Sequence, residues 1–196
     1  MTARDPNIEQ EVHDMVRRIV DGIFGEDTGS PVVAEFDEVS DGPDPVRTVA
    51  IGGDHGGYAL KERLGFKLKE QGFSIIDCGT DSTDAVDYPD IAASVARTVR
   101  SGEADAGVII DGAGIGSAMA ANKIPGIRAA QCYDISTARN AREHNHANVI
   151  TLGAGLIGDA LAWQITQEFL ATPFGGGRHA RRVDKINDLD STPSER

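Results

Sequence analysis

Short apolar segments alternate with segments of helical character from Thr48 onward, and this alternation limits the fold of the chain more than any other feature. Strands are expected over 46–51, 73–77, 106–110, 128–132 and 149–152, and helices over 58–71, 91–100, from 118–122 onward, 136–143 and 157–170. Short apolar strands need cover on both faces, and intervening helices favour parallel pairing. The expected fold is therefore α/β, a three-layer α/β/α Rossmann-like domain with a parallel sheet.

Four parts of the chain differ in composition. We expect a separate N-terminal amphipathic helix over residues 1–24, a flexible linker over 25–47, the α/β domain over 48–187 and a polar, frayed tail over 188–196. Glycine and proline are frequent in the linker. The helix is predicted from apolar residues at spacings of three and four, namely Ile8, Val12, Met15, Val16, Ile19, Val20, Ile23 and Phe24.

Charge and composition exclude several classes of protein. The formal net charge of -12 at pH 7 argues against a nucleic-acid-binding surface. No apolar run is long enough to span a bilayer, and no segment is typical of a signal peptide. Cys78 and Cys132 lie in apolar, strand-like runs, so we expect buried free thiols rather than metal ligands. These features predict a cytoplasmic protein that binds neither nucleic acid nor a membrane.

A glycine-rich loop follows the apolar run that ends at Ile110. It carries Gly112, Gly114 and Gly116 and leads into a helix of small residues. Glycines let the backbone bring its N–H groups close to a ligand, and the following helix adds the positive end of its dipole. The loop suits a phosphate or a developing oxyanion. The alternative is that the glycines serve packing alone.

Two further segments carry groups that transfer protons near neutral pH. Asp54 and His55 directly follow the first predicted strand, between two pairs of glycines. His144 and Asn145 end a helix and lead into the last strand, and we expect them at the same edge of the sheet as Asp54. A histidine at a helix C-terminus also interacts favourably with the helix dipole, so a structural role stays open.

Other segments suggest a phosphorylated ligand. Arg178 and Arg182 belong to a local basic cluster over 175–182 in an otherwise acidic chain, and arginine forks bind phosphate. The alternative is a solvated basic turn, or ion pairs with the abundant acids. Tyr88, in a loop with two acids, either contacts a sugar or packs. A nucleotide site is disfavoured because the glycine loop lacks the Lys-Ser/Thr ending of a P-loop.

Seven motifs in series resemble those of one enzyme family, the ribose-5-phosphate isomerase B and galactose-6-phosphate isomerase family. The resemblance spans about residues 48–187. The motifs are Gly53-Asp54-His55-Gly56-Gly57 with Leu60-Lys61, Asp77-Cys78-Gly79-Thr80, Asp87-Tyr88-Pro89, the glycine loop with Ala120-Ala121-Asn122-Lys123, Gly126-Ile127-Arg128-Ala129, Arg142-Glu143-His144-Asn145 with Asn148-Val149, and Gly177-Arg178-His179 with Arg182-Val183.

The resemblance implies aldose–ketose isomerisation of a sugar phosphate through a cis-enediolate, without a metal or cofactor. It implies that His144 opens the sugar ring beside Asp54, that Asn145 binds the open chain, and that the loop amides hold the oxyanion. It also implies that the two arginines, with His55 nearby, bind the phosphate. The candidate catalytic residues are Asp111, His144, Asp54, Gly112, Gly114 and Gly116, and the candidate substrate-binding residues are His55, Tyr88, Ser117, Asn122, Asn145, Arg178 and Arg182.

The chain departs from the family pattern at four positions. Many members have a cysteine base where this chain has Asp111, and others have a glutamate base where it has Ser117. A hydroxyl-bearing residue is replaced by Ala113, and a phosphate-binding arginine by Gly155. Three interpretations follow: Asp111 is the base, the chain works beside a paralogous subunit as the A-type subunit of galactose-6-phosphate isomerase does, or it binds a sugar phosphate without turnover.

The resemblance also bears on partners. It implies a homodimer or homotetramer with sites built at subunit interfaces. The N-terminal helix and linker resemble the encapsulation peptides of enzymes in bacterial microcompartments, so we expect residues 6–24 to dock on a shell or cargo protein inside such a compartment. The alternative is that this helix packs on its own core or on a neighbouring subunit.

Overall fold

Five parallel strands form the centre of the computed structural model, which describes residues 46–191. The strands are β1 (Thr48–Gly53), β2 (Ser74–Asp77), β3 (Ala106–Asp111), β4 (Ala129–Gln131) and β5 (Val149–Gly153). Their spatial order is β2-β1-β3-β5-β4, with parallel pairing throughout. All carboxyl ends therefore meet at one edge of the sheet, where ligands of such folds usually bind.

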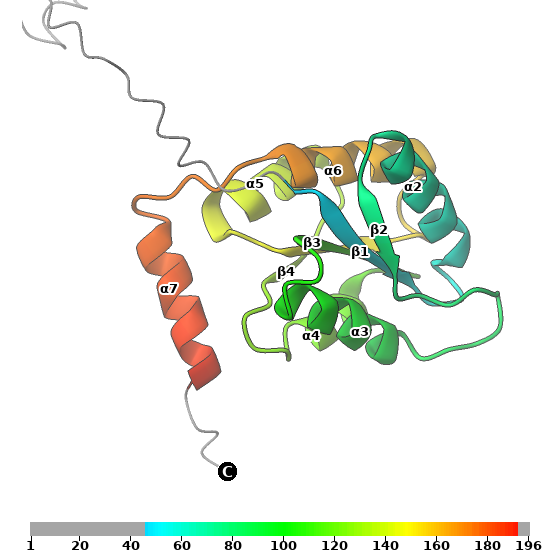
Figure 1. Ribbon diagram of the computed structural model, residues 1–196, viewed down its shortest axis with the longest axis horizontal. Coiled ribbons are helices and arrows are strands. Elements are labelled where there is room, and N and C mark those ends of the chain that lie inside the picture. Colours follow the sequence, from blue (N-terminus) through cyan, green and yellow to red (C-terminus); the bar gives the residue numbers. More distant parts are fainter. Residues whose placement is uncertain (1–45, 192–196) are drawn as a thin grey trace, which may run out of the picture. The chain divides into compact units, whose positions relative to one another are not determined.

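Helices cover both faces of the sheet, as expected for short apolar strands. One face carries α2 (Tyr58–Glu70), α5 (Ile135–Asn145) and α6 (Asp159–Ala171), and the other carries α3 (Tyr88–Arg100) and α4 (Ile115–Ala121). Figure 1 shows these two helical layers on either side of the strands, with α7 (Ala180–Asp188) following them at the C-terminal end.

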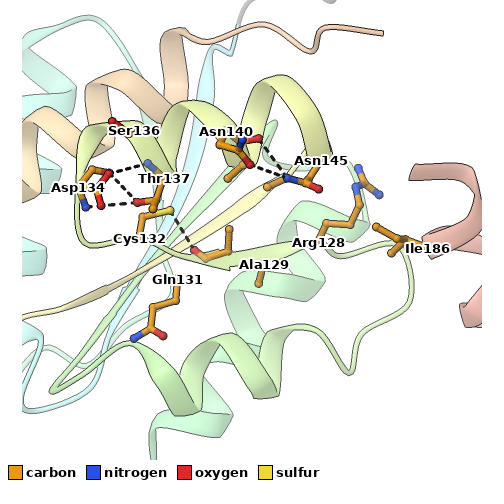
Figure 2. Close-up of a pocket in the computed structure, with 13 residues that line it drawn as sticks. Arg128, Ala129, Gln131, Cys132, Asp134, Ser136, Thr137, Asn140, Asn145 and Ile186 are labelled. Atoms are coloured by element: carbon orange, nitrogen blue, oxygen red, sulfur yellow. Dashed lines mark hydrogen bonds between the residues drawn. The ribbon is translucent and has the colours of Figure 1, made fainter. Parts of the chain in front are cut away.

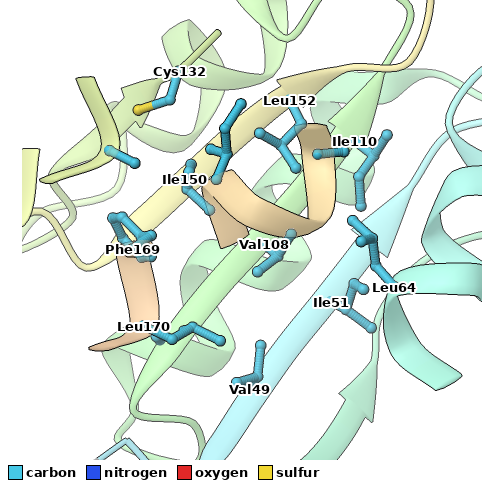
Figure 3. Close-up of a cluster of buried hydrophobic side chains, with 14 of the residues drawn as sticks. Val49, Ile51, Leu64, Val108, Ile110, Cys132, Ile150, Leu152, Phe169 and Leu170 are labelled. Carbon is cyan, nitrogen blue, oxygen red and sulfur yellow. The ribbon is translucent and has the colours of Figure 1, made fainter. Parts of the chain in front are cut away.

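Side chains alternate along each strand, and this divides the core into two clusters. Val49 and Ile51 of β1 point toward α2 and α6, whereas Ala50 between them points toward α3. Figure 3 shows the first cluster, with strand residues packed against Phe169 of α6. Burying a side chain such as Ile51 stabilises the fold by about 1.5–3 kcal/mol, so the continuous apolar strands hold the three layers together.

Most predicted elements are present, with shifted ends. Helix α3 begins at Tyr88 rather than at 91, because Pro89 lies in the first turn, where its missing N–H costs nothing. Helix α4 begins at Ile115 rather than near 118. Cys132 is buried as expected, but Cys78 is only half-buried, with its Sγ 3.5 Å from Thr98 Oγ1.

The C-terminal segment differs more from the prediction. Helix α7 was not predicted, and residues 188–191, expected to fray, complete α7 and form a 3-10 turn (Leu189–Ser191). Asp190 Oδ2 accepts a hydrogen bond from Gly126 N at 2.6 Å, which ties this turn to the domain. The predicted N-terminal helix and the linker up to residue 45 lie outside the described residues. Over 46–191, no helix is both long and apolar enough to cross a membrane.

Candidate active site

Two aspartates lie side by side at the carboxyl edge of the sheet. The register pairs Gly53 of β1 with Ile110 of β3, so Asp54 and Asp111 are adjacent at the ends of neighbouring strands. Both are buried, at 7% and 5% exposure. Asp54 Oδ1 accepts a hydrogen bond from Gly57 N at 2.8 Å, which anchors the loop before α2.

Asp111 holds the glycine loop through four hydrogen bonds. Its Oδ1 accepts from the backbone N–H groups of Ala113, at 2.7 Å, and Gly114. Its Oδ2 accepts from the N–H of Ser117, at 3.2 Å, and from the Ser117 hydroxyl. The carboxylate thereby satisfies N–H groups that the start of α4 would otherwise leave without acceptors.

The loop amides divide into two sets. Gly114 adopts a left-handed conformation (φ 77°), and its N–H is occupied by Asp111. The N–H groups of Gly112 and Gly116 have no acceptor within the described part of the chain. These two remain available to a ligand at the positive end of the α4 dipole. Of the three predicted oxyanion donors, Gly114 is therefore committed to the fold.

Tyr88 and His55 lie around this loop. The ring of Tyr88 covers Gly116 so closely that a Cβ there would lie 2.5 Å from it, which explains the glycine. His55 is exposed, and its Nδ1 accepts a hydrogen bond from Val86 N at 3.4 Å. Both predicted residues thus stand at the carboxyl edge near Asp54 and Asp111.

Two residues that the sequence interpretation did not select also support the loop. Gln131 Nε2 donates to the Ala113 carbonyl at 2.6 Å, and Tyr133 Oη donates to the same oxygen at 3.2 Å. Gln131 and Tyr133 also bond to each other. A polar residue at the end of an apolar strand was the available signal for Gln131.

His144 and Asn145 do not share this edge, and the prediction that they do is wrong. Helix α5 follows β4 and begins at the carboxyl edge, where Asp134 and Thr137 form a capping box. It ends at Asn145, a few residues before β5 begins. Figure 2 shows Asp134 and Asn145 at opposite ends of this helix. A helix that feeds a parallel strand ends at the amino edge, and the five residues of β5 separate the two edges by about 13 Å.

A second group of predicted residues gathers at the amino edge. The rings of His144 and His179 stack with centroids 4.3 Å apart, and His144 Nδ1 lies 2.8 Å from Asn140 Nδ2. Arg178 and Arg182 are exposed beside His179 and have no ion pair among residues 46–191. Desolvation, followed by the charges of His144 and the two arginines, lowers the pKa of His179.

Asn122 serves the fold. Its Nδ2 donates to the carbonyls of Ala118 and Ala129, at 2.9 and 2.8 Å, and its Oδ1 accepts from Ala129 N at 2.8 Å. The side chain thereby joins the end of α4 to the start of β4. It lies at the amino edge with its amide committed, away from the glycine loop.

Known proteins match this chain over the α/β domain. A family model described as Ribose/Galactose Isomerase matches residues 49–186. Ribose-5-phosphate isomerase B of Escherichia coli is 40% identical over 145 residues, which are 74% of this chain and 97% of that protein. D-erythrulose-4-phosphate isomerase of Pectobacterium atrosepticum is 40% identical over 140 residues, which are 71% of this chain and 92% of that protein.

Solved structures agree with the sequence matches. Ribose-5-phosphate isomerase B of Clostridium thermocellum matches with a TM-score of 0.73 at 48% identity. The match covers 74% of this chain and 97% of that chain. The Mycoplasma genitalium protein of that name, solved with bound ribulose-5-phosphate, has a TM-score of 0.73 at 38% identity, with 76% and 99% covered. The predicted fold class of the domain is confirmed.

Proposed function

The chain belongs to the ribose/galactose isomerase family, and on that premise we propose that it interconverts the aldose and ketose forms of a sugar phosphate through a cis-enediolate. Such a reaction needs a base at one carbon and stabilisation of the oxyanion on its neighbour. The observation that carries the proposal is the buried Asp111 carboxylate beside two loop amides, those of Gly112 and Gly116, that have no acceptor within residues 46–191.

We propose Asp111 as the base. The resemblance gives the family two positions for this group, and in this chain their occupants, Asp111 and Ser117, are hydrogen-bonded to each other. The side chains at these two positions therefore meet, so a base attached at either position can reach the space beside the glycine loop. In this proposal Asp111 takes the proton from the carbon beside the carbonyl, while the amides of Gly112 and Gly116 stabilise the oxygen that becomes negative.

The remaining roles belong to the amino-edge residues. We propose that His144 opens the sugar ring, that Asn145 binds the open chain, and that Arg178 and Arg182 bind the phosphate. The exposed guanidinium groups carry uncompensated charge within the described residues, and this supports an anionic ligand. One copy of the chain holds this group at the edge opposite Asp111.

We therefore propose that a homodimer completes the site. Strand β4 is an edge strand, and a groove of about 600 Å³ runs along it, lined by β4, α5 and Ile186 of α7. In a second copy related by a two-fold axis beside β4, the strands would run antiparallel to those of the first copy. Its carboxyl edge, with Asp111, would then face the His144 and Arg178 of the first copy.

Proton NMR in deuterium oxide tests the activity directly. The purified chain is offered phosphates of four-, five- and six-carbon aldoses and ketoses, because its relatives are named for both four- and five-carbon substrates. We expect interconversion of at least one pair, with solvent deuterium entering at the carbon beside the carbonyl. Sugar-phosphate binding without exchange across the panel would instead indicate a binding protein or a missing partner subunit.

A further inference from the structure

The four hydrogen bonds to Asp111 differ in what their donors can do. At Oδ1 both donors are backbone N–H groups, those of Ala113 and Gly114. At Oδ2 one donor is the backbone N–H of Ser117 and the other is the Ser117 hydroxyl. A backbone N–H can only donate, whereas a hydroxyl can donate or accept.

This difference matters when the carboxylate takes up a proton. A proton on Oδ1 would point at N–H groups that cannot accept it, in a site where Asp111 is 5% exposed and Ser117 is fully buried. Leaving a buried donor unpaired is costly. A proton on Oδ2 has an acceptor, because the Ser117 hydroxyl can turn its hydrogen toward a carbonyl of the preceding turn, as serines near the start of a helix do, and present a lone pair to Asp111.

We infer that Ser117 is a positioning residue that makes Oδ2 of Asp111 the oxygen that carries the proton during isomerisation. This inference rests on the proposed function, in which Asp111 is the base. The substrate C–H bond breaks, its electron pair forms the C–C double bond of the enediolate, and the carbonyl pair moves to oxygen. The proton resides on Oδ2 and donates to Ser117 Oγ until it returns to the neighbouring carbon. In the same step the hydroxyl proton on that side of the enediolate passes to the oxygen that was the carbonyl, so a new carbonyl and a new hydroxyl form and the charges balance.

The test compares wild type with Ser117→Ala by isomerisation kinetics across pH. Loss of the hydroxyl removes a donor to the ionised carboxylate and the acceptor for the protonated one. We expect kcat to fall about ten-fold to 100-fold, as for loss of a hydrogen bond to a charged group. The acidic limb of the kcat profile should move to higher pH, because the lost hydrogen bond to the ionised carboxylate is stronger than the lost hydrogen bond from the neutral acid. Ser117→Thr keeps the hydroxyl and should retain the wild-type limb.

Thr151→Val is the matched control. Thr151 is fully buried, and its hydroxyl donates to the Gly114 carbonyl at 2.8 Å, so it supports the same loop without touching Asp111. This variant should lower Tm and leave the acidic limb in place. If Ser117→Ala does not fold, Ser117→Cys keeps a side chain of similar shape and replaces the hydroxyl by a thiol, a weaker donor and acceptor, so the limb should move in the same direction.

The outcomes separate this inference from the proposed function. An active wild type whose acidic limb does not move on loss of the Ser117 hydroxyl would overturn the inference and leave the isomerase intact. An equal movement in Thr151→Val would also overturn it, because the effect would then be structural. A wild type that neither isomerises nor exchanges any substrate would overturn the proposed function, and the inference with it.

Discussion

The two edges of the sheet hold their polar groups in opposite ways. At the carboxyl edge, Asp54 and Asp111 are buried, and their oxygens accept hydrogen bonds from the chain's own loops. At the amino edge, Arg178 and Arg182 are exposed, and neither has an ion pair within residues 46–191. The first edge is organised before any ligand arrives, and the second keeps its charge available for one.

This difference indicates which edge suits proton transfer and which suits phosphate binding. A base and oxyanion donors work best when they are held in place beforehand, because no free energy is then spent on orienting them during the reaction. A phosphate can be bound by exposed guanidinium groups, whose charge-assisted hydrogen bonds form on binding. In the proposed function, the comparison therefore predicts that Asp111 decides turnover and that Arg178 decides affinity.

Asp111→Asn tests the carboxyl edge and should have the largest effect. The amide keeps the shape of the side chain but cannot act as the base, so kcat should fall by about 10²–10⁴-fold. The measurement is kcat for the substrate found in the NMR panel, with sugar-phosphate affinity measured by calorimetry. Affinity should change little.

Asp105→Asn is the control for this variant. Asp105 also accepts two backbone hydrogen bonds, from Arg47 N and Thr48 N at 2.8 Å each, but it directly precedes β3 and so lies at the amino edge of the sheet. Its substitution should leave kcat near that of wild type. An unchanged kcat in Asp111→Asn would remove Asp111 from the mechanism.

Arg178→Ala tests the amino edge and should raise KM with a smaller change in kcat. Loss of charge-assisted hydrogen bonds to phosphate predicts a rise of about ten-fold to 100-fold. Arg139→Ala is a matched control, since Arg139 is also exposed but already pairs with Glu168 at 2.6 Å. Equal KM values for wild type and Arg178→Ala would contradict the phosphate role.

Mixing two inactive variants tests whether the edges meet between copies. Dimers formed from Asp111→Asn and His144→Ala chains contain one intact site when each site takes the two residues from different copies. Random mixing should recover about a quarter of wild-type activity, because half the dimers are mixed and each has one working site. Refolding the variants together and assaying turnover measures this. No recovery after verified exchange of chains would contradict a site shared between copies.

His146→Asn should have the smallest effect, on stability rather than turnover. His146 (φ 49°) stacks on Phe174 at 4.4 Å, and desolvation, then Arg128 and Arg142, lower its pKa. Below about pH 6.5 the unfolded chain therefore binds more protons at this histidine than the folded chain does. The contribution of His146 to stability is complete above that pH and is lost as pH falls toward the lowered pKa of the folded state. Asparagine tolerates this backbone conformation and does not titrate.

Thermal unfolding between pH 7.5 and 5 checks this expectation. The drop in Tm on acidification should be smaller in His146→Asn than in wild type. The difference should be about 2–4 °C for each kcal/mol that the protonation of His146 removes from the free energy of unfolding. Identical slopes of Tm against pH in the two proteins would contradict the assignment.

Sequence periodicity was sufficient for the sheet but not for the C-terminal helix. The strands at 106–111 and 149–153 are continuous apolar runs, and burial on both faces leaves such runs few alternatives. Helix α7 was missed because its apolar stripe is short and narrow, consisting of Ala180, Val183 and Ile186 among charged residues, and only Val183 is buried. Its basic residues predicted phosphate binding rather than a helix.

Local sequence was therefore enough to predict the three-layer fold and to select the glycine loop and the polar residues of the proposed site. It was enough because periodicity, glycine and charge act over a few neighbouring residues. Only the folded chain showed that Asp111 bonds to Ser117 and that Gln131 holds the Ala113 carbonyl. It also put His144 at the edge away from Asp111, because chain direction through a parallel sheet, and not distance along the sequence, decides which groups meet.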